Sequence, residues 1–409
     1  METPNYRIAT LSNGLRVALR HTPDSLVSYI GIAVNAGSRD EDSSRHGLAH
    51  FVEHTIFKGT ASRRSWHISN RMESIGGELN AYTSKEETVI YTNAPAGNAA
   101  RAIELLYDIV ANSRFPESEL EKEREVVIEE INSYLDSPAD SVYDEIEELV
   151  YAGSGLAHNI LGSKDSVRSL TGHDCREFLD SWYVAGNMTA YIADPTDPDR
   201  LIALMEKYFG RLHFEGRKHE RILPPPCRGF DKVIDRQGHQ AHTILAYRLF
   251  GRKDPRRFAL FLLNNYLGGP CMNSRLNQEL REKRGLVYTV DSSVGLLSDT
   301  GLMQIYFGCD PGGSERCVKI IRKEIDRLAS ASLSDRAFEA IRNQYCGQLL
   351  VSSDNRESMA MSMGKSLLYY DEIHDIPRTT ERIRSVTKEE FLDMARMIAD
   401  APLSRLTIK

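Results

Sequence analysis

The chain has 409 residues, of which 41% are hydrophobic, and its 58 acidic residues exceed its 51 basic residues to give a net charge of −7. A chain of this length is expected to bury a sizeable core and to divide into two or three domains. An acidic balance without a long run of either charge argues against nucleic acid or an anionic membrane surface as the main partner.

The start of the chain, Met1 to Tyr6, lacks the basic and apolar regions of a secretion signal, and no apolar run is long enough to span a bilayer. The six cysteines are scattered and contain no Cys-x-x-Cys pair. That pattern argues for free thiols in a reducing compartment rather than a disulfide framework or a cysteine zinc site. We therefore expect a cytoplasmic protein that is neither exported nor membrane-spanning.

An N-terminal β-hairpin is predicted from Arg7–Leu11 and Leu15–Arg20, which flank Ser12-Asn13-Gly14. Asn-Gly supplies the positive φ angles that tight hairpin turns need. A further strand is predicted at Leu26–Asn35, which is apolar on both faces.

The hydrophobic pattern then changes from a strand period to a helix period. Leu48, Phe51, Val52 and Ile56 recur at helical spacing, and the polar cluster Asp42-Ser43-Ser44 before them is expected to cap the start of this helix. Strands are predicted next at Glu78–Thr83 and Glu87–Asn93, followed by a helix at Asn98–Ala111 and a longer one that Pro116 opens and that runs to Leu135.

The polar segment Leu212–Arg228 contains Pro224-Pro225-Pro226, which can continue neither a helix nor a central strand. We place a linker at 216–230, between an N-terminal domain at 1–215 and a C-terminal domain at 231–409. The order of elements repeats after the linker, with a strand at His242–Arg248, helices at Arg256–Leu267 and Ser274–Glu282, strands at Val287–Val294 and Leu302–Gly308, and a long helix. Because a strand, a proline-containing turn and a helix recur in both halves, we predict an α+β fold of two duplicated domains, each a mostly antiparallel sheet packed by helices.

A possible metal site lies in the first predicted helix, at His50-Phe51-Val52-Glu53-His54. The spacing places two imidazoles one turn apart on a single helix face, with a carboxylate beside them. Two such imidazoles can share one zinc ion, and Glu53 can act as a general base. For these five residues alone, a pair of histidines on an amphipathic helix without a metal is an equally good interpretation.

A catalytic zinc needs a third protein ligand, and Glu130 is the candidate. It falls within the apolar stripe that Leu120, Val127, Ile131 and Tyr134 mark on the long helix, and Glu123 lies two turns earlier on the same face. Carboxylates along a buried stripe are costly unless they are paired or bound to metal. The alternative is that both lean out to solvent or pair with arginines.

The phrase from Gly47 to Thr60, together with Glu130, resembles the pitrilysin-like (inverzincin) zinc metallopeptidases, in particular the branch of bacterial and mitochondrial processing peptidases. The resemblance covers nearly the whole chain and implies a metalloprotease fold of the LuxS/MPP-like type. It further implies that His50, His54 and Glu130 bind one Zn²⁺ per chain, that Glu53 is the base, and that Glu123 supports the site. Leu262–Leu267, at the corresponding position of the second copy, contains no histidine, so only the first copy is expected to bind metal.

Other stretches carry the same resemblance. Asn80, Ala81 and Tyr82 match the edge strand on which the family adds a substrate backbone to its sheet. In the stretch Ser274–Tyr288, Arg281 and Tyr288 match residues that contact the substrate carbonyl, where they could polarise it and hydrogen-bond the developing oxyanion. Taken without the family, these two would pass as a surface charge and a half-buried strand tyrosine. His158 is expected to pack or cap rather than to act chemically.

The sequence therefore predicts a zinc-dependent endopeptidase that hydrolyses unfolded peptides within a clamshell chamber. Because the chain has the length of one half of such a clamshell, we expect a homodimer or a complex with a related subunit. The main alternative is a non-catalytic scaffold, or a processing subunit of the same family that depends on a partner. An unrelated protein with an incidental histidine pair is the remaining alternative.

Overall fold

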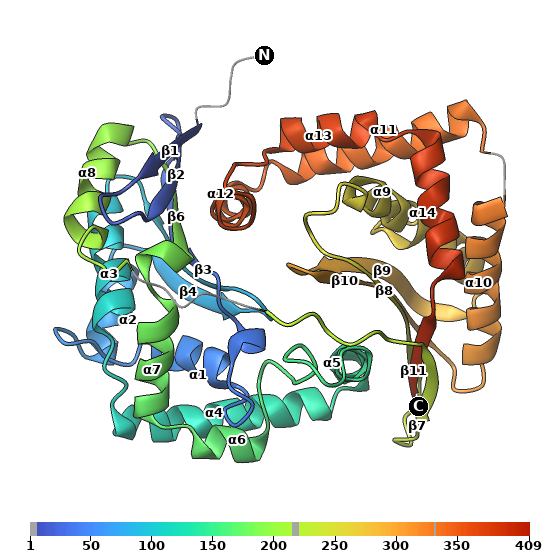
Figure 1. Cartoon of the computed structure of the whole chain (residues 1–409), viewed down its shortest axis with the longest axis horizontal. Helices are drawn as coiled ribbons and strands as arrows, with labels where there is room; N and C mark the ends of the chain where they lie inside the picture. Colours follow the sequence, from blue (N-terminus) through green and yellow to red (C-terminus); the bar gives the residue numbers. More distant parts are fainter. Residues whose placement is uncertain (1–5, 215–220, 331–332) are drawn as a thin grey trace. The chain divides into compact units, whose positions relative to one another are not determined.

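The computed structural model describes residues 6–214, 221–330 and 333–409, so residues 216–220 of the predicted linker lie outside the described part. The chain divides into two compact units, and both draw on more than one stretch of sequence (Figure 1). The first comprises Met1–Ile131, His158–Arg221 and Ser353–Asp375, and the second comprises Asn132–Ala157, Ile222–Ser352 and Ile376–Lys409. The contiguous domains at 1–215 and 231–409 stay a prediction, because each compact unit also contains a short segment from the other half of the chain.

The first unit is built on a six-stranded sheet with the strand order β1-β2-β6-β3-β5-β4. Only β2 and β6 pair in parallel, and all other neighbours are antiparallel. Its strands are β1 (Tyr6–Thr10), β2 (Arg16–His21), β3 (Val27–Val34), β4 (Glu78–Thr83), β5 (Thr88–Pro95) and β6 (Met188–Asp194). Its helices are α1 (Leu48–Thr55), α2 (Ser65–Glu73), α3 (Ala99–Asn112), the first turns of α4 (Glu117–Leu135), α6 (Lys164–Ser169), α7 (Gly172–Trp182), α8 (Pro198–Phe209) and α12 (Arg356–Tyr370), with short 3₁₀ turns η1 (Ser38–Asp40) and η2 (Ala185–Asn187).

The second unit is built on a five-stranded sheet with the order β7-β11-β8-β10-β9. Here β7 and β11 are parallel, and the other neighbours are antiparallel. Its strands are β7 (Phe230–Ile234), β8 (Ala241–Phe250), β9 (Val287–Leu296), β10 (Thr300–Cys309) and β11 (Leu403–Ile408). Its helices are α5 (Pro138–Val150), α9 (Arg257–Gly268), the π-helix η3 (Asn277–Glu282), α10 (Ser314–Ser330), α11 (Asp335–Ser352), α13 (Ile376–Ser385) and α14 (Lys388–Asp400).

The two sheets share one topology. If β1 is set aside, the strands of the first sheet lie in the order first, fifth, second, fourth, third along the chain, and the second sheet has the same order. The single parallel pair also occupies the same place in both sheets. This agreement of order and direction confirms the predicted α+β fold of two duplicated, mostly antiparallel sheets packed by helices.

Alternate residues of the central strands enter different cores, as the two-residue period of a strand requires. Along β6, Met188, Ala190 and Ile192 pack into the core that contains α1, α3 and α7, whereas Tyr191 and Ala193 pack against α12. Along β8 of the second unit, Leu245 and Tyr247 enter the larger core, whereas Ile244 and Ala246 pack with α5. Both sheets are therefore covered on both faces.

The helices that cover the second face of each sheet come from the other half of the sequence. Helix α12 follows the second sheet's strands β7 to β10 along the chain but packs on β2, β3 and β6 of the first sheet. Helix α5 precedes all strands of the second sheet but packs on its β8 and β11. Since β3 and β6 correspond to β8 and β11 in the shared topology, the two halves exchange equivalent helices.

Two details of the predicted elements are wrong. The cluster Asp42-Ser43-Ser44 does not cap α1, because the helix begins after Gly47 and Asp42 instead accepts hydrogen bonds from Ser44. Tyr134 does not belong to the buried stripe of α4, because it lies in the last turn and is 42% exposed.

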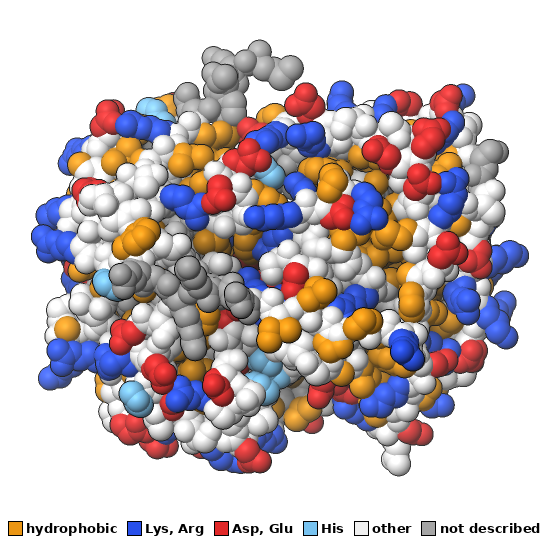
Figure 2. All heavy atoms as spheres, in the orientation of Figure 1, with side chains coloured by type: hydrophobic (Ala, Val, Ile, Leu, Met, Phe, Trp, Pro, Cys, Tyr) orange, Lys and Arg blue, Asp and Glu red, His pale blue; other side chains and the backbone are white. Residues whose placement is uncertain are grey.

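No helix among the described residues is both long and apolar enough to cross a bilayer. Figure 2 shows acidic and basic side chains interspersed over the visible face of the molecule. All six cysteines are free thiols.

We predict that Gly364→Ala destabilises the first unit by about 1–3 kcal/mol. A Cβ atom at Gly364 of α12 would lie 2.4 Å from the ring of Tyr191 in β6, so the helix would have to move off the sheet. The matched control is Gly347→Ala in α11, where a Cβ atom meets nothing within 4 Å and helix propensity should add about 0.5–1 kcal/mol. Thermal unfolding measures both, and equal midpoints for the two variants would contradict the close approach of α12.

Candidate metal centre

Helix α1 holds the two predicted histidines inside the first unit. Phe51 and Val52 are fully buried in the core and fix the rotation of the helix. The i, i+4 spacing then places His50 and His54 on the same face, with ring centroids 4.6 Å apart. His50 is only 7% exposed, whereas the side chain of His54 is 22% exposed, so solvent reaches this face of the helix at His54.

Helix α4 brings Glu130 to the two imidazoles. Its Oε2 atom lies 3.7 Å from Nε2 of His50 and 3.5 Å from Nε2 of His54, and one ligand atom from each residue lies within 4.8 Å of the others. Tetrahedral zinc with ligand bonds of about 2.0–2.1 Å has ligand atoms separated by roughly 3.3 Å. The two Nε2–Oε2 distances are close to that separation, so the two nitrogens and one carboxylate oxygen could hold such an ion.

Glu123 lies behind His54 rather than beside Glu130 as a further ligand. Its Oε2 atom is 3.3 Å from Nδ1 of His54, and its Oε1 atom is 2.7 Å from Nζ of Lys58. A carboxylate on Nδ1 holds the tautomer whose Nε2 atom is free to bind metal. Glu123 is thus placed to orient a ligand, and the ion pair with Lys58 balances its charge in a buried position.

The arrangement shifts the pKa values of His50, His54 and Glu130. Burial, aided by the neighbouring His54, lowers the pKa of His50 to about 4. Burial also acts to lower the pKa of His54, but Glu130, Glu53 and Glu123 outweigh it and raise that pKa. The hydrogen bond with His54 lowers the pKa of Glu130. At neutral pH His50 is therefore neutral and ready to bind metal, whereas the carboxylates around His54 favour its protonated form, which competes with metal binding.

Glu53 lies on α1 between the two histidines in sequence. Burial raises the pKa of Glu53, with a further rise from Glu130, while Thr83 and His54 oppose the change. A carboxylate of raised pKa beside a metal cluster can accept and return a proton near neutral pH. Thr83 is the last residue of β4, so the edge strand reaches the proposed base directly.

The residues Asn80, Ala81 and Tyr82 lie in β4, at the edge of the first sheet. Among the described strands, β4 pairs only with β5. The hydroxyl of Tyr82 donates to Glu87, which also pairs with Lys365 of α12 at 2.5 Å. The exchanged helix thereby braces the hairpin that presents this edge.

Arg281 and Tyr288 lie in the second unit, away from the metal ligands in sequence and in domain. Arg281 is exposed on η3, which is a π-helix where the sequence predicted an ordinary helix. Tyr288 on β9 is 57% exposed and donates its hydroxyl to Asp310 over 2.8 Å. Both side chains are accessible, and their roles toward a substrate stay a prediction.

Lys58 was not anticipated from the sequence, although it stands four residues after His54 in the same phrase. Only the fold shows that it pairs with Glu123 across the helices. A second unanticipated contact joins the carboxylate of Glu41 to the start of α1.

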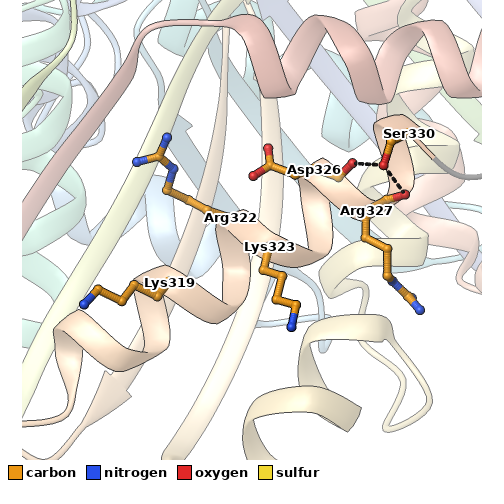
Figure 3. Close-up of a pocket in the computed structure, with 6 residues that line it drawn as sticks. All are labelled: Lys319, Arg322, Lys323, Asp326, Arg327 and Ser330. Carbon is orange, nitrogen blue, oxygen red and sulfur yellow. Dashed lines mark hydrogen bonds between the residues drawn. The ribbon is translucent and has the colours of Figure 1, made fainter.

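A hollow in the second unit lies apart from this chemistry. Figure 3 shows that its lining comes from α10, with Lys319, Arg322, Lys323, Asp326, Arg327 and Ser330. It combines four cationic side chains with one carboxylate, which is not a set of ligands that a divalent metal prefers. We assign it no part in the site.

Two family models match the chain. The model described as Insulinase (Peptidase family M16) matches residues 16–164, and the one described as Peptidase M16 inactive domain matches residues 169–345. His50, Glu53, His54, Glu123 and Glu130 all fall within the first match. The inactive-domain match therefore contains none of the candidate metal ligands.

Relatives of known sequence or structure match both halves. An uncharacterized zinc protease of Mycobacterium leprae is 31% identical over 396 residues, covering 95% of this chain and 88% of the relative. The mitochondrial-processing peptidase subunit beta of Bos taurus is 30% identical over 400 residues, covering 95% and 81%. A peptidase M16 inactive domain from Pseudomonas fluorescens has the same fold, with a TM-score of 0.91 at 18% identity over 99% of this chain and 97% of that one.

The duplicated sheets, together with a cluster of two histidines and one glutamate, are typical of one class of protein, the metallopeptidases. The chain belongs to the pitrilysin-like M16 (insulinase) peptidase family, as the resemblance in the sequence predicted.

We predict that Glu130→Gln weakens binding of a divalent metal by more than about 100-fold, because loss of a ligand should cost more than loss of an orienting partner. The matched control is Glu129→Gln, which changes an exposed carboxylate one residue away on α4. Competition with a chromophoric chelator measures both affinities. Equal affinities for the two variants would exclude Glu130 as a ligand.

Proposed function

We propose that the protein is a zinc-dependent endopeptidase with Glu53 as its general base. The observation that supports this most is the convergence of His50, His54 and Glu130, which each place one ligand atom within 4.8 Å of the others. The donor set suits zinc, and several relatives are named zinc proteases.

Zinc bound by these three residues would supply a Lewis acid that polarises the scissile carbonyl. Glu53 takes a proton from the water that attacks this carbonyl and passes it to the departing amine. Glu123, neutralised by Lys58, holds His54 in the tautomer that binds metal. Arg281 and Tyr288 polarise the carbonyl and hydrogen-bond the developing oxyanion.

The substrate class we propose is an unfolded peptide. The open edge of β4 offers backbone donors and acceptors to an extended chain, and Asn80, Ala81 and Tyr82 lie along that edge. A peptide added there would run beside the strand that ends at Thr83, next to Glu53. A folded protein could not present such a strand without opening.

We further propose that two such chains, or this chain and a related subunit, enclose the substrate in a clamshell chamber. A subunit of mitochondrial-processing peptidase is among the relatives, which supports assembly with a related chain, and the homodimer remains the simplest form. A cytoplasmic location is part of the proposal, and six free thiols suit a reducing compartment.

The competing function is that of a non-catalytic scaffold or of a processing subunit that is inactive without a partner. It is favoured by the family model that matches residues 169–345 and by the Pseudomonas fluorescens structure, since both are described as a peptidase M16 inactive domain. The intact set of His50, Glu53, His54 and Glu130 argues against it, since a scaffold has no need for convergent ligands and a carboxylate of raised pKa.

The test is hydrolysis of an internally quenched peptide library by the purified protein. We expect cleavage that disappears with a chelator, returns with zinc and is absent in Glu53→Gln. The Glu53→Gln variant should still bind zinc, because it keeps all three ligands. No cleavage under any condition, despite bound zinc and a folded protein, would favour the scaffold or partner-dependent subunit.

If Arg281 serves the zinc site of an opposite subunit, two inactive variants should complement each other. We expect that mixing Glu53→Gln chains with Arg281→Ala chains restores part of the activity, because one of the two sites in a mixed dimer keeps both residues. Peptide hydrolysis after subunit exchange measures this rescue. Stable mixed dimers without activity would argue against sharing between subunits.

A further inference from the structure

The N-terminal end of α1 is capped by a residue outside the helix. This helix has eight residues and begins after Gly47, whose φ of 92° places it in the left-handed region and which has no side chain to act as a cap. The first N–H groups of any helix lack partners within it and need others when they are buried. Leu48, Ala49 and His50 are all buried.

Glu41 supplies a partner on either side of Leu48, whose own amide donates to the backbone carbonyl of Arg45. Its Oε2 atom accepts a hydrogen bond from the amide of Gly47 over 2.8 Å, and its Oε1 atom accepts one from the amide of Ala49 over 2.7 Å. The side chain of Glu41 is fully buried. Ala49 directly precedes His50, so both bonds act on the turn that carries the first metal ligand.

His158 holds the carboxylate of Glu41 from the other side. Its Nε2 atom lies 2.9 Å from Oε2 of Glu41, and its ring stacks on that of His46 with centroids 3.8 Å apart and planes within 2°. Lys85 donates to the backbone carbonyl of His158 over 2.6 Å. The capping carboxylate is thus fixed by side chains from separate segments, and His158 packs as the sequence predicted.

The backbone segments around this contact lie too close together to accept a side chain. A Cβ atom at Gly47 would lie 2.6 Å from the carbonyl oxygen of Leu161, and one at Gly162 would lie 2.4 Å from that of His46. Glycine at both positions lets the loop at 161–162 close over the start of α1. The helix end cannot tilt without breaking these contacts.

We propose that Glu41 is a positioning residue for the metal centre, and that His158 keeps Glu41 in place. This inference rests on the proposed zinc site. Because α1 spans only about two turns, a tilt of its first turn displaces His50 and His54 together from Glu130, which stands on a separate helix. The capping bonds therefore help to set the distances from the two histidines to Glu130.

The test compares Glu41→Gln and His158→Phe with the unaltered protein. Glu41→Gln keeps the shape but replaces one acceptor oxygen with a donor that faces an N–H group. His158→Phe keeps a ring to stack on His46 and removes the bond to Glu41, so it is the milder variant should Glu41→Gln fold poorly. The matched control is Asp194→Asn, because Asp194 is a buried carboxylate of the same unit that accepts from the hydroxyl of Ser28 and the amide of Thr196, both of which lie outside α1.

Three readouts separate positioning from stability: zinc affinity by chelator competition, the visible spectrum of the cobalt-substituted protein, and the thermal midpoint of the metal-free protein. We expect about 10- to 100-fold weaker zinc binding and a changed cobalt spectrum for Glu41→Gln, the range typical of residues that orient ligands, and a smaller effect in the same direction for His158→Phe. Asp194→Asn should lower the midpoint without changing either metal readout.

Wild-type zinc affinity and cobalt spectrum in folded Glu41→Gln or His158→Phe would overturn the inference. Equal loss of affinity in Asp194→Asn would also overturn it, because the effect would then be general destabilisation. Failure of the unaltered protein to bind zinc would refute the proposed function itself. Zinc binding without peptide hydrolysis would count against the peptidase and leave the role of Glu41 open to the same measurements.

Discussion

Burial of a short helix decides where the chemistry of this protein can take place. Helix α1 is packed into the core of the first unit through Phe51 and Val52, and its opposite face carries His50 and His54. Polar groups inside a core need partners, and α4 places Glu130 near both imidazoles and Glu123 against Nδ1 of His54. Fixed partners on two rigid helices give a ligand set that is organised before any metal arrives.

The charged groups around the three candidate ligands alternate in sign. Glu130 faces the imidazoles, Glu123 stands behind His54, and Lys58 stands behind Glu123. Each charged group has an opposite or hydrogen-bonding neighbour, which limits the cost of burial. The carboxylate of Glu41 plays a comparable part at the helix end, where backbone N–H groups carry a partial positive charge.

Duplication explains the scaffold but not the site. Both sheets have the same order and directions, and each receives a covering helix from the other half of the sequence. Such an exchange makes each unit depend on both halves of the chain. Yet α9, which follows β8 as α1 follows β3, buries Leu262 and Leu263 and has no histidine. The second copy has kept the packing and carries no metal ligands of this kind.

Much of the local structure could be predicted from the sequence. The strand and helix periods predicted β1 to β5, α1, α3 and α4 in the first half, and β8, α9, β9 and β10 in the second, to within a few residues, because periodic burial of apolar side chains is a local property. Helices α2 and α5 to α8 and strands β6 and β7 were not predicted. His50, Glu53 and His54 could be found for the same reason, since a single helix turn brings them together. Glu130 was found by its costly place in an apolar stripe and by family resemblance.

What the sequence by itself determined was therefore the elements with a clear period, the duplicated fold and the candidate ligands. Only the tertiary structure decided that α5 and α12 exchange units, that Lys58 pairs with Glu123, and that Glu41 rather than Asp42 caps α1. Tyr134 follows the helical pattern of α4, but its side chain is exposed because the core of the first unit does not extend to the last turn of that helix. The physical reason is the same in each case: these contacts join residues distant in the chain or depend on how far a core extends, and no local period encodes either.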